Sequence, residues 1–151
     1  MITSRRRELS SDESGFTLVE VLVVVVIIGI LASIAIAAFL KTRENAYAGQ
    51  AKSDLRNLAS AEEFYLGDHD QYISGGAAEL AAEGFRQTVG IKLGVGVVAN
   101  TGYCAAALAP DGSYYWWDSE AGGLQSVATP SLSPPATAGG ACAAAPPTSL
   151  G

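Results

Sequence analysis

The stretch Gly15-Phe16-Thr17-Leu18-Val19-Glu20 begins an apolar run that continues through residues 21–40. Residues 21–40 contain no charged side chain. About 20 apolar residues are enough to cross a lipid bilayer as a helix. Glu20 is therefore a lone carboxylate near the start of a membrane-length segment, where it costs about 3 kcal/mol in lipid and is expected to serve a function.

A short polar leader, residues 1–15, precedes this run. It contains Arg5, Arg6 and Arg7, and positive charge before a membrane span favours retention on the cytoplasmic side. A secretory signal peptide has a shorter apolar region that is followed by its cleavage site. The leader and the long run together do not fit that pattern.

These residues resemble the N-terminus of the type IV pilin family, which includes pilins and the major pseudopilins. In that family a basic leader is cut after a glycine, the new N-terminal phenylalanine is N-methylated, and a glutamate stands fifth. The resemblance implies cleavage between Gly15 and Phe16, N-methylation of Phe16, and Glu20 as the fifth-position glutamate. Residues 28–36 also resemble the family. The proline that often follows is Ala37 here, so the helix is expected to continue.

Glu20 has two interpretations. As an assembly residue, its carboxylate pairs with the N-terminal amine of Phe16 in a neighbouring subunit, because opposite charges in a dry core offset each other's desolvation. As an ordinary residue at the membrane edge, it reaches the lipid surface and has no partner. The resemblance favours the assembly interpretation for Phe16 and Glu20.

The remaining length fits one domain beyond the membrane segment. We expect a cleaved leader at 1–15, a transmembrane and filament-core helix at 16–40 and a soluble head at 41–151. The formal net charge of −6 and the small number of basic clusters argue against a dedicated nucleic-acid site. A single histidine, no phosphate-binding loop and no paired carboxylates argue against an enzyme, and no cofactor is expected.

Residues 41–66 have the apolar spacing of an amphipathic helix that continues the first one and ends near Gly67-Asp68. A helix of some 50 residues follows. Glu62 falls inside the apolar stripe and interrupts it. The expected stripe is Tyr47, Ala48, Ala51, Leu55, Leu58, Ala59, Tyr65 and Leu66.

The rest of the head changes to strand composition. Strands are expected at 85–89, 91–99, 103–108 and 113–118, with turns at Gly75-Gly76, 100–102 and 110–112 and a short helix at 77–83. The resulting small antiparallel sheet is expected to bury its apolar face against the amphipathic helix. Residues from 122 onward are expected to be loop. The predicted fold is α+β: a long hydrophobic then amphipathic helix on a small antiparallel sheet, with a disulfide-bounded C-terminal loop.

Two cysteines, Cys104 and Cys142, lie in the head. An even cysteine count in an exported chain indicates one disulfide. A metal site or two free thiols are the alternatives. In the family that the chain resembles, such a disulfide encloses a region exposed on the filament, and the resemblance makes Cys104–Cys142 its counterpart.

Three polar or aromatic clusters have less specific patterns. The run Tyr114-Tyr115-Trp116-Trp117 alternates between the two faces of a strand, so it supplies core packing or an exposed contact patch. Asp68, His69 and Asp70 suggest either a metal site or a polar loop at a helix end. Residues 118–120 contain potential calcium ligands but lack an aspartate-rich pattern, so no metal residue is assigned.

The resemblance implies a type IV pilin that polymerises into a filament. Its implied partners are copies of itself, the prepilin peptidase and methyltransferase, the assembly platform with its ATPase, and the inner membrane before assembly. Its implied location is the cytoplasmic membrane as a precursor and then the extracellular pilus. The alternatives are a major pseudopilin of a type II secretion system and a membrane-tethered monomeric binding module.

Overall fold

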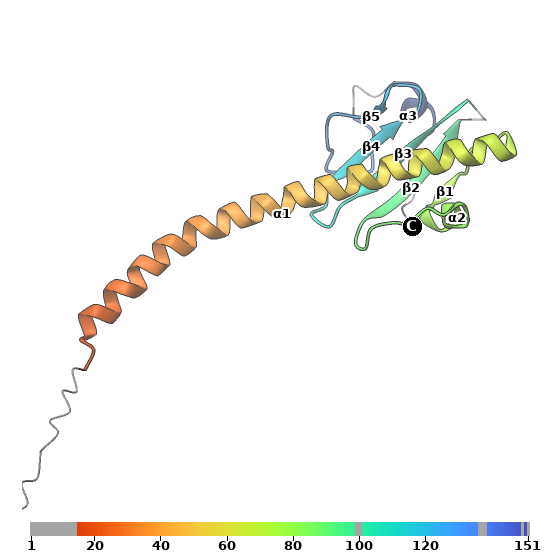
Figure 1. Cartoon of the computed structure of the whole chain (residues 1–151). Helices are drawn as coiled ribbons and strands as arrows, with labels where there is room; N and C mark the ends of the chain where they lie inside the picture. Colours follow the sequence, from red (N-terminus) through yellow and green to blue (C-terminus); the bar gives the residue numbers. More distant parts are fainter. Residues whose placement is uncertain (1–14, 99–100, 136–138, 149, 151) are drawn as a thin grey trace, which may run out of the picture. The chain divides into compact units, whose positions relative to one another are not determined.

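The computed structural model describes residues 15–98, 101–135, 139–148 and 150. The elements follow in the order α1, β1, α2, the 3-10 turn η1, β2, β3, β4, β5 and α3 (Figure 1). The chain divides into two compact units, Met1–Leu40 and Lys41–Gly151. The second unit is called the head below.

Helix α1, Leu18–His69, has 52 residues and no proline. It continues through Ala37, as expected where the chain lacks a helix-breaking residue. It ends because Asp70 takes a left-handed φ of 55°. The N–H of Asp70 bonds to the carbonyl of Leu66 at 2.9 Å and closes the last turn. The helix thus extends slightly beyond the predicted end at Gly67-Asp68.

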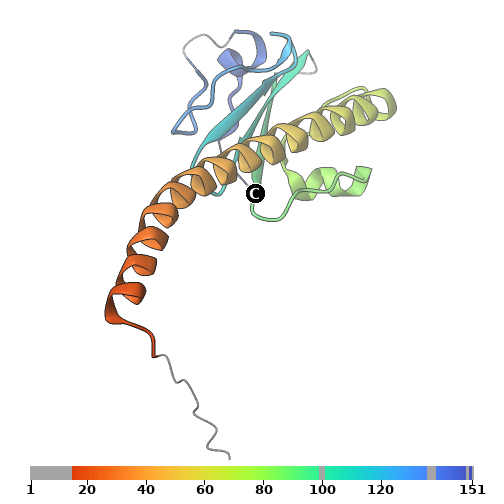
Figure 2. The ribbon, with the colours of Figure 1, turned by 60° about the vertical axis from the view of Figure 1, so that its left-hand side comes forward.

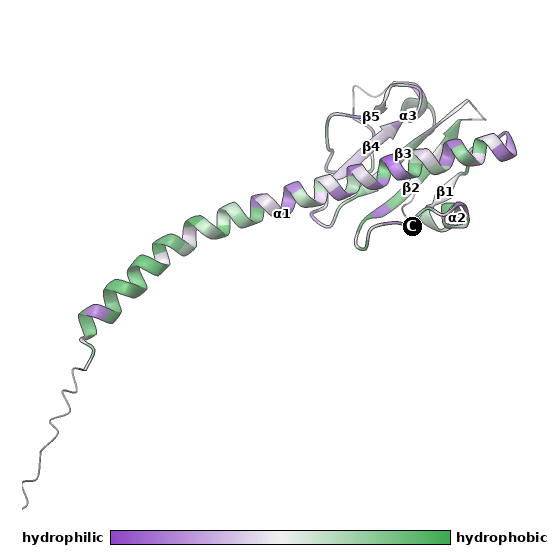
Figure 3. Cartoon of the chain, viewed as in Figure 1, coloured by the Kyte–Doolittle hydropathy of each residue, from purple (hydrophilic) through white to green (hydrophobic). Residues whose placement is uncertain are grey.

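Hydropathy changes along α1 (Figure 3). Its apolar half lies in the first unit, where it forms the one candidate membrane span among the described residues. Within the head, polar and apolar residues of α1 alternate at helical spacing, and most of the apolar ones up to Ala61 are buried, whereas Phe64 is exposed. The amphipathic stripe is confirmed for Tyr47, Ala48, Ala51, Leu55, Leu58 and Ala59, which are buried or packed against the core.

The head contains one five-stranded antiparallel sheet in the order β1-β2-β3-β4-β5. Because every neighbour pair is antiparallel and consecutive, short turns are sufficient to connect most strands. One such turn, between β3 and β4, has the bond from Gly112 N–H to the Ala109 carbonyl at 3.0 Å. The strands are β1 Gly75–Gly76, β2 Lys92–Val98, β3 Gly102–Leu108, β4 Tyr114–Asp118 and β5 Gly123–Leu124.

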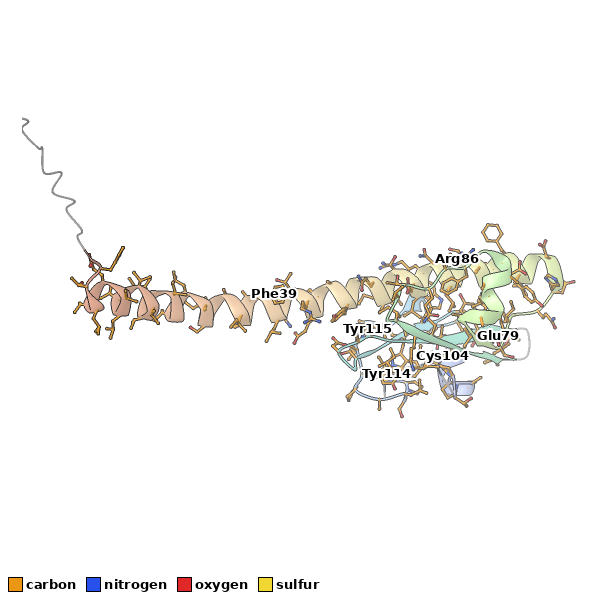
Figure 4. All side chains as sticks on the ribbon, turned by 90° about the horizontal axis from the view of Figure 1, so that it is seen from below. Phe39, Glu79, Arg86, Cys104, Tyr114 and Tyr115 are labelled. Atoms are coloured by element: carbon orange, nitrogen blue, oxygen red, sulfur yellow. A yellow bond between two sulfur atoms is a disulfide. The ribbon has the colours of Figure 1, made fainter. Side chains whose placement is uncertain are left out.

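One face of the sheet packs against the head portion of α1 (Figures 1 and 4). Leu55 and Leu58 from α1 are fully buried. They join Leu93 of β2, Ala105 of β3 and Tyr115 of β4 in one apolar cluster. This is the helix-on-sheet layer that the sequence predicts.

The opposite face of the sheet is also covered, which corrects the expectation of a single buried face. The C-terminal segment with α3, Gly140–Ala144, lies there, so the sheet stands between two layers (Figures 2 and 4). Trp116 is fully buried on this side, and its Nε1 donates to Thr129 Oγ1 at 2.9 Å. The second cluster comprises Cys104, Ala106, Trp116, Ala141 and Cys142.

The aromatic run on β4 serves both layers. Tyr115 is buried in the cluster on the α1 side, whereas Trp116 is buried on the α3 side. Figure 4 shows Tyr114 and Tyr115 on opposite sides of the sheet. Strand alternation is therefore confirmed, and both faces contribute to packing.

Three local predictions are wrong. Residues from 122 onward are not all loop, because they include β5 and α3, and Ala141 and Cys142 of α3 are fully buried. Residues 85–89 form no strand, because the N–H and hydroxyl of Thr88 bond to Asp54 and the following residues turn. Gly75-Gly76 forms β1 rather than a turn, pairing with Gly94 and Val95 of β2. The short helix at 77–83 is confirmed as α2, Ala77–Leu80, followed by η1, Ala81–Glu83. The predicted turn at 100–102 lies partly outside the described residues.

Candidate assembly site

The bond between Gly15 and Phe16 lies at an exposed position before α1. Phe16 exposes 85% of its surface. A Cβ built on Gly15 would meet no atom within 4 Å. No atom of the described residues therefore covers this peptide bond.

Glu20 bonds to Thr17 in a reciprocal capping arrangement. The Glu20 carboxylate oxygen Oε2 accepts the Thr17 N–H at 2.9 Å and the Thr17 hydroxyl at 2.8 Å. In return, the N–H of Glu20 donates to Thr17 Oγ1 at 3.2 Å. This capping box satisfies two of the orphan donors at the start of α1. The carboxylate thus already has local partners within one chain.

Thr17 is a residue that the sequence reasoning missed. A threonine followed three positions later by a glutamate, ahead of an apolar run, is the sequence pattern of a capping box. That pattern is present within residues 15–20. Thr17 is consequently the cap, and α1 begins at Leu18 rather than at Phe16.

The apolar half of α1 has an exposed hydrophobic surface. Its large side chains from Leu18 to Leu40 are between 47 and 80% exposed. Near the middle, Gly29 meets no atom within 4 Å at its Cβ position, so another helix backbone has room to approach. Ser33 is not an unsatisfied polar group, since its hydroxyl donates to the Ile30 carbonyl at 2.7 Å. Such a surface is stable only in lipid or against other apolar helices.

Cys104 and Cys142 form a disulfide that joins residues 38 apart in sequence. The predicted pairing is confirmed, and the metal-site and free-thiol alternatives are wrong. The bond links β3 to α3. It therefore attaches the C-terminal layer covalently to the middle of the sheet.

Asp118 makes a second attachment at the same place. It is fully buried and lies opposite Cys104 in the β3–β4 register. Its Oδ2 accepts the Cys142 N–H at 2.7 Å, and its Oδ1 accepts the Ala141 N–H at 3.2 Å. Oδ1 also accepts the N–H groups of Glu120 and Ala121. A buried carboxylate with four N–H donors is well compensated.

The two candidate metal clusters do not converge on a site. Asp118 is occupied by backbone donors, and Ser119 Oγ accepts the Tyr103 N–H at 2.8 Å. His69 stacks on Tyr65 at 4.0 Å between ring centroids. Within the described ranges, no group of three or more His, Cys, Asp or Glu side chains is placed to hold a metal ion.

Besides Asp118, the described part of the head has two buried carboxylates, Asp54 and Glu62, both on α1. Neither of them was assigned a role from the sequence. Asp54 accepts the N–H of Thr88 at 2.9 Å and its hydroxyl at 2.8 Å, which holds the loop before β2 against α1. Glu62 accepts the Ile73 N–H at 2.9 Å. Burial raises the pKa of Glu62 to about 7, aided by the nearby Glu63 charge and opposed by the Ile73 N–H. The sequence contains one hint of these roles, the position of Glu62 inside the apolar stripe, and it contains none for Asp54.

Comparison with known proteins places the N-terminal features in a family. The prokaryotic N-terminal methylation motif matches residues 10–36. This chain has a prepilin-type N-terminus. The match includes Gly15, Phe16 and Glu20, together with most of the apolar run.

Three known proteins are similar over a longer stretch. The type IV major pilin protein PilA of Myxococcus xanthus is 39% identical over 98 residues, which is 64% of this chain and 42% of that protein. The type II secretion system core protein G of Aeromonas hydrophila is 43% identical over 60 residues, 40% of this chain and 42% of that protein. The core protein G of Pseudomonas aeruginosa is 40% identical over 63 residues, 42% of this chain and 44% of that protein. The matches thus span about two fifths of each relative's length.

Proposed function

We propose that this chain is a structural subunit that polymerises into a type IV pilus after removal of residues 1–15 and N-methylation of Phe16. The observation that carries the proposal is the exposed apolar half of α1, which begins at an accessible Gly15–Phe16 bond and contains Glu20 as its single charge. A surface of this kind fits first a bilayer and then a bundle of identical helices. The role is mechanical rather than catalytic.

Filament growth follows from the geometry of such contacts. When one face of a helix packs on a different face of the next copy, the contact does not close on itself and propagates as a helical filament. The small residues Gly29, Ala32 and Ser33 let neighbouring backbones come close. The partners proposed are therefore copies of the same chain, with the inner membrane as the environment before assembly.

Glu20 sets the register in this proposal. Cleavage before Phe16 creates a free amine but leaves the Thr17 N–H as an amide, so the capping box survives processing. The carboxylate accepts through one oxygen, Oε2, in the described bonds. Its remaining oxygen is available to the Phe16 amine of a neighbouring copy, and two opposite charges offset each other's desolvation in a dry core.

The proposed life cycle involves further partners and two locations. The leader, residues 1–15, stays in the cytoplasm until a prepilin peptidase and methyltransferase acts. Residues 16–40 anchor the precursor in the cytoplasmic membrane, and the head, 41–151, lies outside it. An assembly platform and its ATPase then extract the chain into an extracellular filament.

The first experiment is co-expression of the full chain with a prepilin peptidase, followed by intact-mass measurement. Loss of residues 1–15 together with one added methyl group on Phe16 is the expected product. An intact leader in the presence of active peptidase would favour the membrane-tethered binding module instead.

The second experiment separates the charge of Glu20 from its capping role. Glu20→Gln keeps an oxygen for the Thr17 donors but removes the charge, so it is expected to be processed and yet yield no sheared filaments in electron micrographs. Thr17→Ala removes the cap and keeps the carboxylate, so filaments should persist. Glu44→Ala, in the polar part of α1, is the matched control. Filaments at normal yield from the Glu20→Gln variant would refute the charge-pairing role.

A major pseudopilin of a type II secretion system is the second candidate, because core protein G relatives match 60 and 63 residues at 43 and 40% identity. The disulfide and the longer match to a major pilin favour the pilus. Addition of calcium distinguishes the two. We expect unchanged thermal unfolding of the head, since Asp118 is occupied by N–H donors; a large increase in melting temperature would favour the pseudopilin.

A further inference from the structure

Glu62 is a fully buried carboxyl group with an incomplete set of partners. Its Oε2 accepts the Ile73 N–H at 2.9 Å. Its Oε1 is buried and has no hydrogen-bond partner among the described residues. A buried polar oxygen without a partner is costly when neutral and far more costly when charged.

The Ile73 N–H belongs to residues 71–76, which we call the strap. The strap follows the end of α1 and supplies β1, Gly75–Gly76, to the edge of β2. Ile73 and Tyr72 pack against the apolar cluster, with the Tyr72 ring 5.0 Å from the Tyr103 ring. The strap is thus held by two apolar side chains, a two-residue strand and the bond to Glu62.

The groups around Glu62 do not compensate a negative charge. On α1, the neighbouring Glu63 has the same sign and accepts the Tyr72 hydroxyl at 3.4 Å. Tyr103 of β3 faces both carboxyl groups, and the Glu120 charge acts on Tyr72 from beyond β4. The only salt bridge of the described part of the chain joins Lys41 and Glu44. Burial, with Glu63, therefore raises the pKa of Glu62 to about 7.

We propose that Glu62 makes attachment of the strap to α1 depend on its proton, so that the strap closes over a neutral carboxyl group and opens when the group ionises. Opening lets water reach the carboxylate and removes the uncompensated buried charge. It also separates β1 from β2 and leaves the edge of β2 without a partner. The head therefore has one arrangement in mildly acidic medium and a looser one at alkaline pH.

Glu79 also contacts the strap, but it does not contribute to the pH dependence of strap opening. Glu79 of α2 accepts the Gly76 N–H at 2.8 Å. That bond lowers the pKa of Glu79, so it stays ionised throughout the range in which Glu62 titrates. Glu79 therefore adds no ionisation step of its own between pH 5 and 8.5, and the Glu62 carboxyl carbon identifies the step that belongs to Glu62.

The test is an NMR titration of the full chain in detergent micelles from pH 5 to 8.5. The side-chain carboxyl carbon of Glu62 reports its ionisation, and amide protection at Ile73 and β1, corrected for intrinsic exchange, reports strap opening. Linkage predicts that protection falls about tenfold per pH unit up to the midpoint near pH 7 and then levels off. Glu62→Gln removes the titrating proton and should make protection independent of pH. Glu63→Gln keeps the dependence and lowers the midpoint.

Two results would overturn the proposal. One is a Glu62 carboxyl carbon that titrates at the ordinary value near 4.5. The other is a titration near pH 7 during which protection at Ile73 and β1 stays constant. The wild-type titration alone decides between these outcomes if Glu62→Gln fails to fold.

Discussion

The carboxylate of Asp118 accepts the backbone N–H of Cys142 at 2.7 Å, beside the disulfide that joins Cys142 to Cys104. Asp118 and Cys104 are direct partners on adjacent strands, so both point to the same face of the sheet. The C-terminal layer is therefore attached at one place by a covalent bond and by a buried charge with N–H donors.

Replacing Asp118 by Asn should destabilise the head by about 3 kcal/mol. The amide keeps one acceptor oxygen and places an NH₂ group against donors that now lack an acceptor. Denaturant unfolding of the full chain under reducing and oxidising conditions measures the loss in free energy of unfolding. Asp111→Asn is the control, because Asp111 accepts a single exposed bond from the Ser113 N–H at 2.9 Å. Equal losses in the two variants would contradict the anchoring role of Asp118.

Removal of the disulfide by Cys104→Ser with Cys142→Ser should cost about 2–4 kcal/mol, mainly through greater freedom of the unfolded chain. The Asp118 bonds remain, so the double variant should still fold with α3 in place. The variant with all three substitutions should lose more free energy of unfolding than the sum of the two separate losses. The reason is that either attachment alone keeps α3 in place when the other is missing. Strict additivity in this cycle would show that the two attachments act independently.

Asp54→Ala should destabilise the head by about 2–3 kcal/mol, since it leaves the N–H and hydroxyl of Thr88 without their acceptor. The loss should be concentrated in the loop before β2, where amide exchange would rise before global unfolding. Thr88→Val removes one of the two bonds and should cost about half as much. Asp68→Ala, at an exposed position of α1, should change stability by less than about 0.5 kcal/mol.

Gly96→Ala should displace the C-terminal segment. A Cβ on Gly96 would overlap the Ala145 carbonyl and lie 2.9 Å from the Pro146 carbonyl carbon, and backbone atoms cannot move aside as a flexible side chain can. Gly49→Ala is a matched control with the opposite expected sign, because nothing lies within 4 Å of that position in α1. It should stabilise the helix by about 1 kcal/mol. Thermal unfolding of both variants provides the comparison.

Stability should fall as pH rises from about 4.5 to about 7. The pKa of Glu62 is raised to about 7 in the folded state by burial, so the folded chain binds the proton more tightly than the unfolded chain. The stabilisation that this proton provides is fully present below the pKa that Glu62 has in the unfolded chain. It is lost as pH rises through the pKa of Glu62 in the folded chain. The total is on the order of 3 kcal/mol. Melting temperatures at pH 5 and pH 8 should differ for the natural chain and coincide for Glu62→Gln.

Much of this fold was predictable because its signals are local. The apolar run at 21–40 and the stripe through Leu55 and Leu58 both repeat at helical spacing. The strands β3 and β4 flank the turn residues 110–112, where Gly112 has a positive φ of 87°. In each case neighbouring residues alone determine the structure.

The missed features depend on contacts between distant residues. Two glycines have no preference for a strand, and Gly75–Gly76 becomes β1 only because the edge of β2 accepts it. The alanines of the C-terminal segment show no periodic apolar pattern, yet Ala141 is fully buried. At the candidate site, the role of Asp118 depends on Cys142, 24 positions later. No spacing rule connects such residues.

The central strand β3 carries Ala105, Ala106 and Ala107, and alanine is a weak strand former. Its methyl groups are fully buried toward both layers. Leu124 still packs on the α1 side and Thr129 is bonded to Trp116, but Leu132 of the following residues 130–135 packs on the α3 side. Residues 130–135 can therefore change in sequence and length without altering how α1 packs. The chain can thus diversify the surface inside the loop that the disulfide closes while the packing of α1 stays the same.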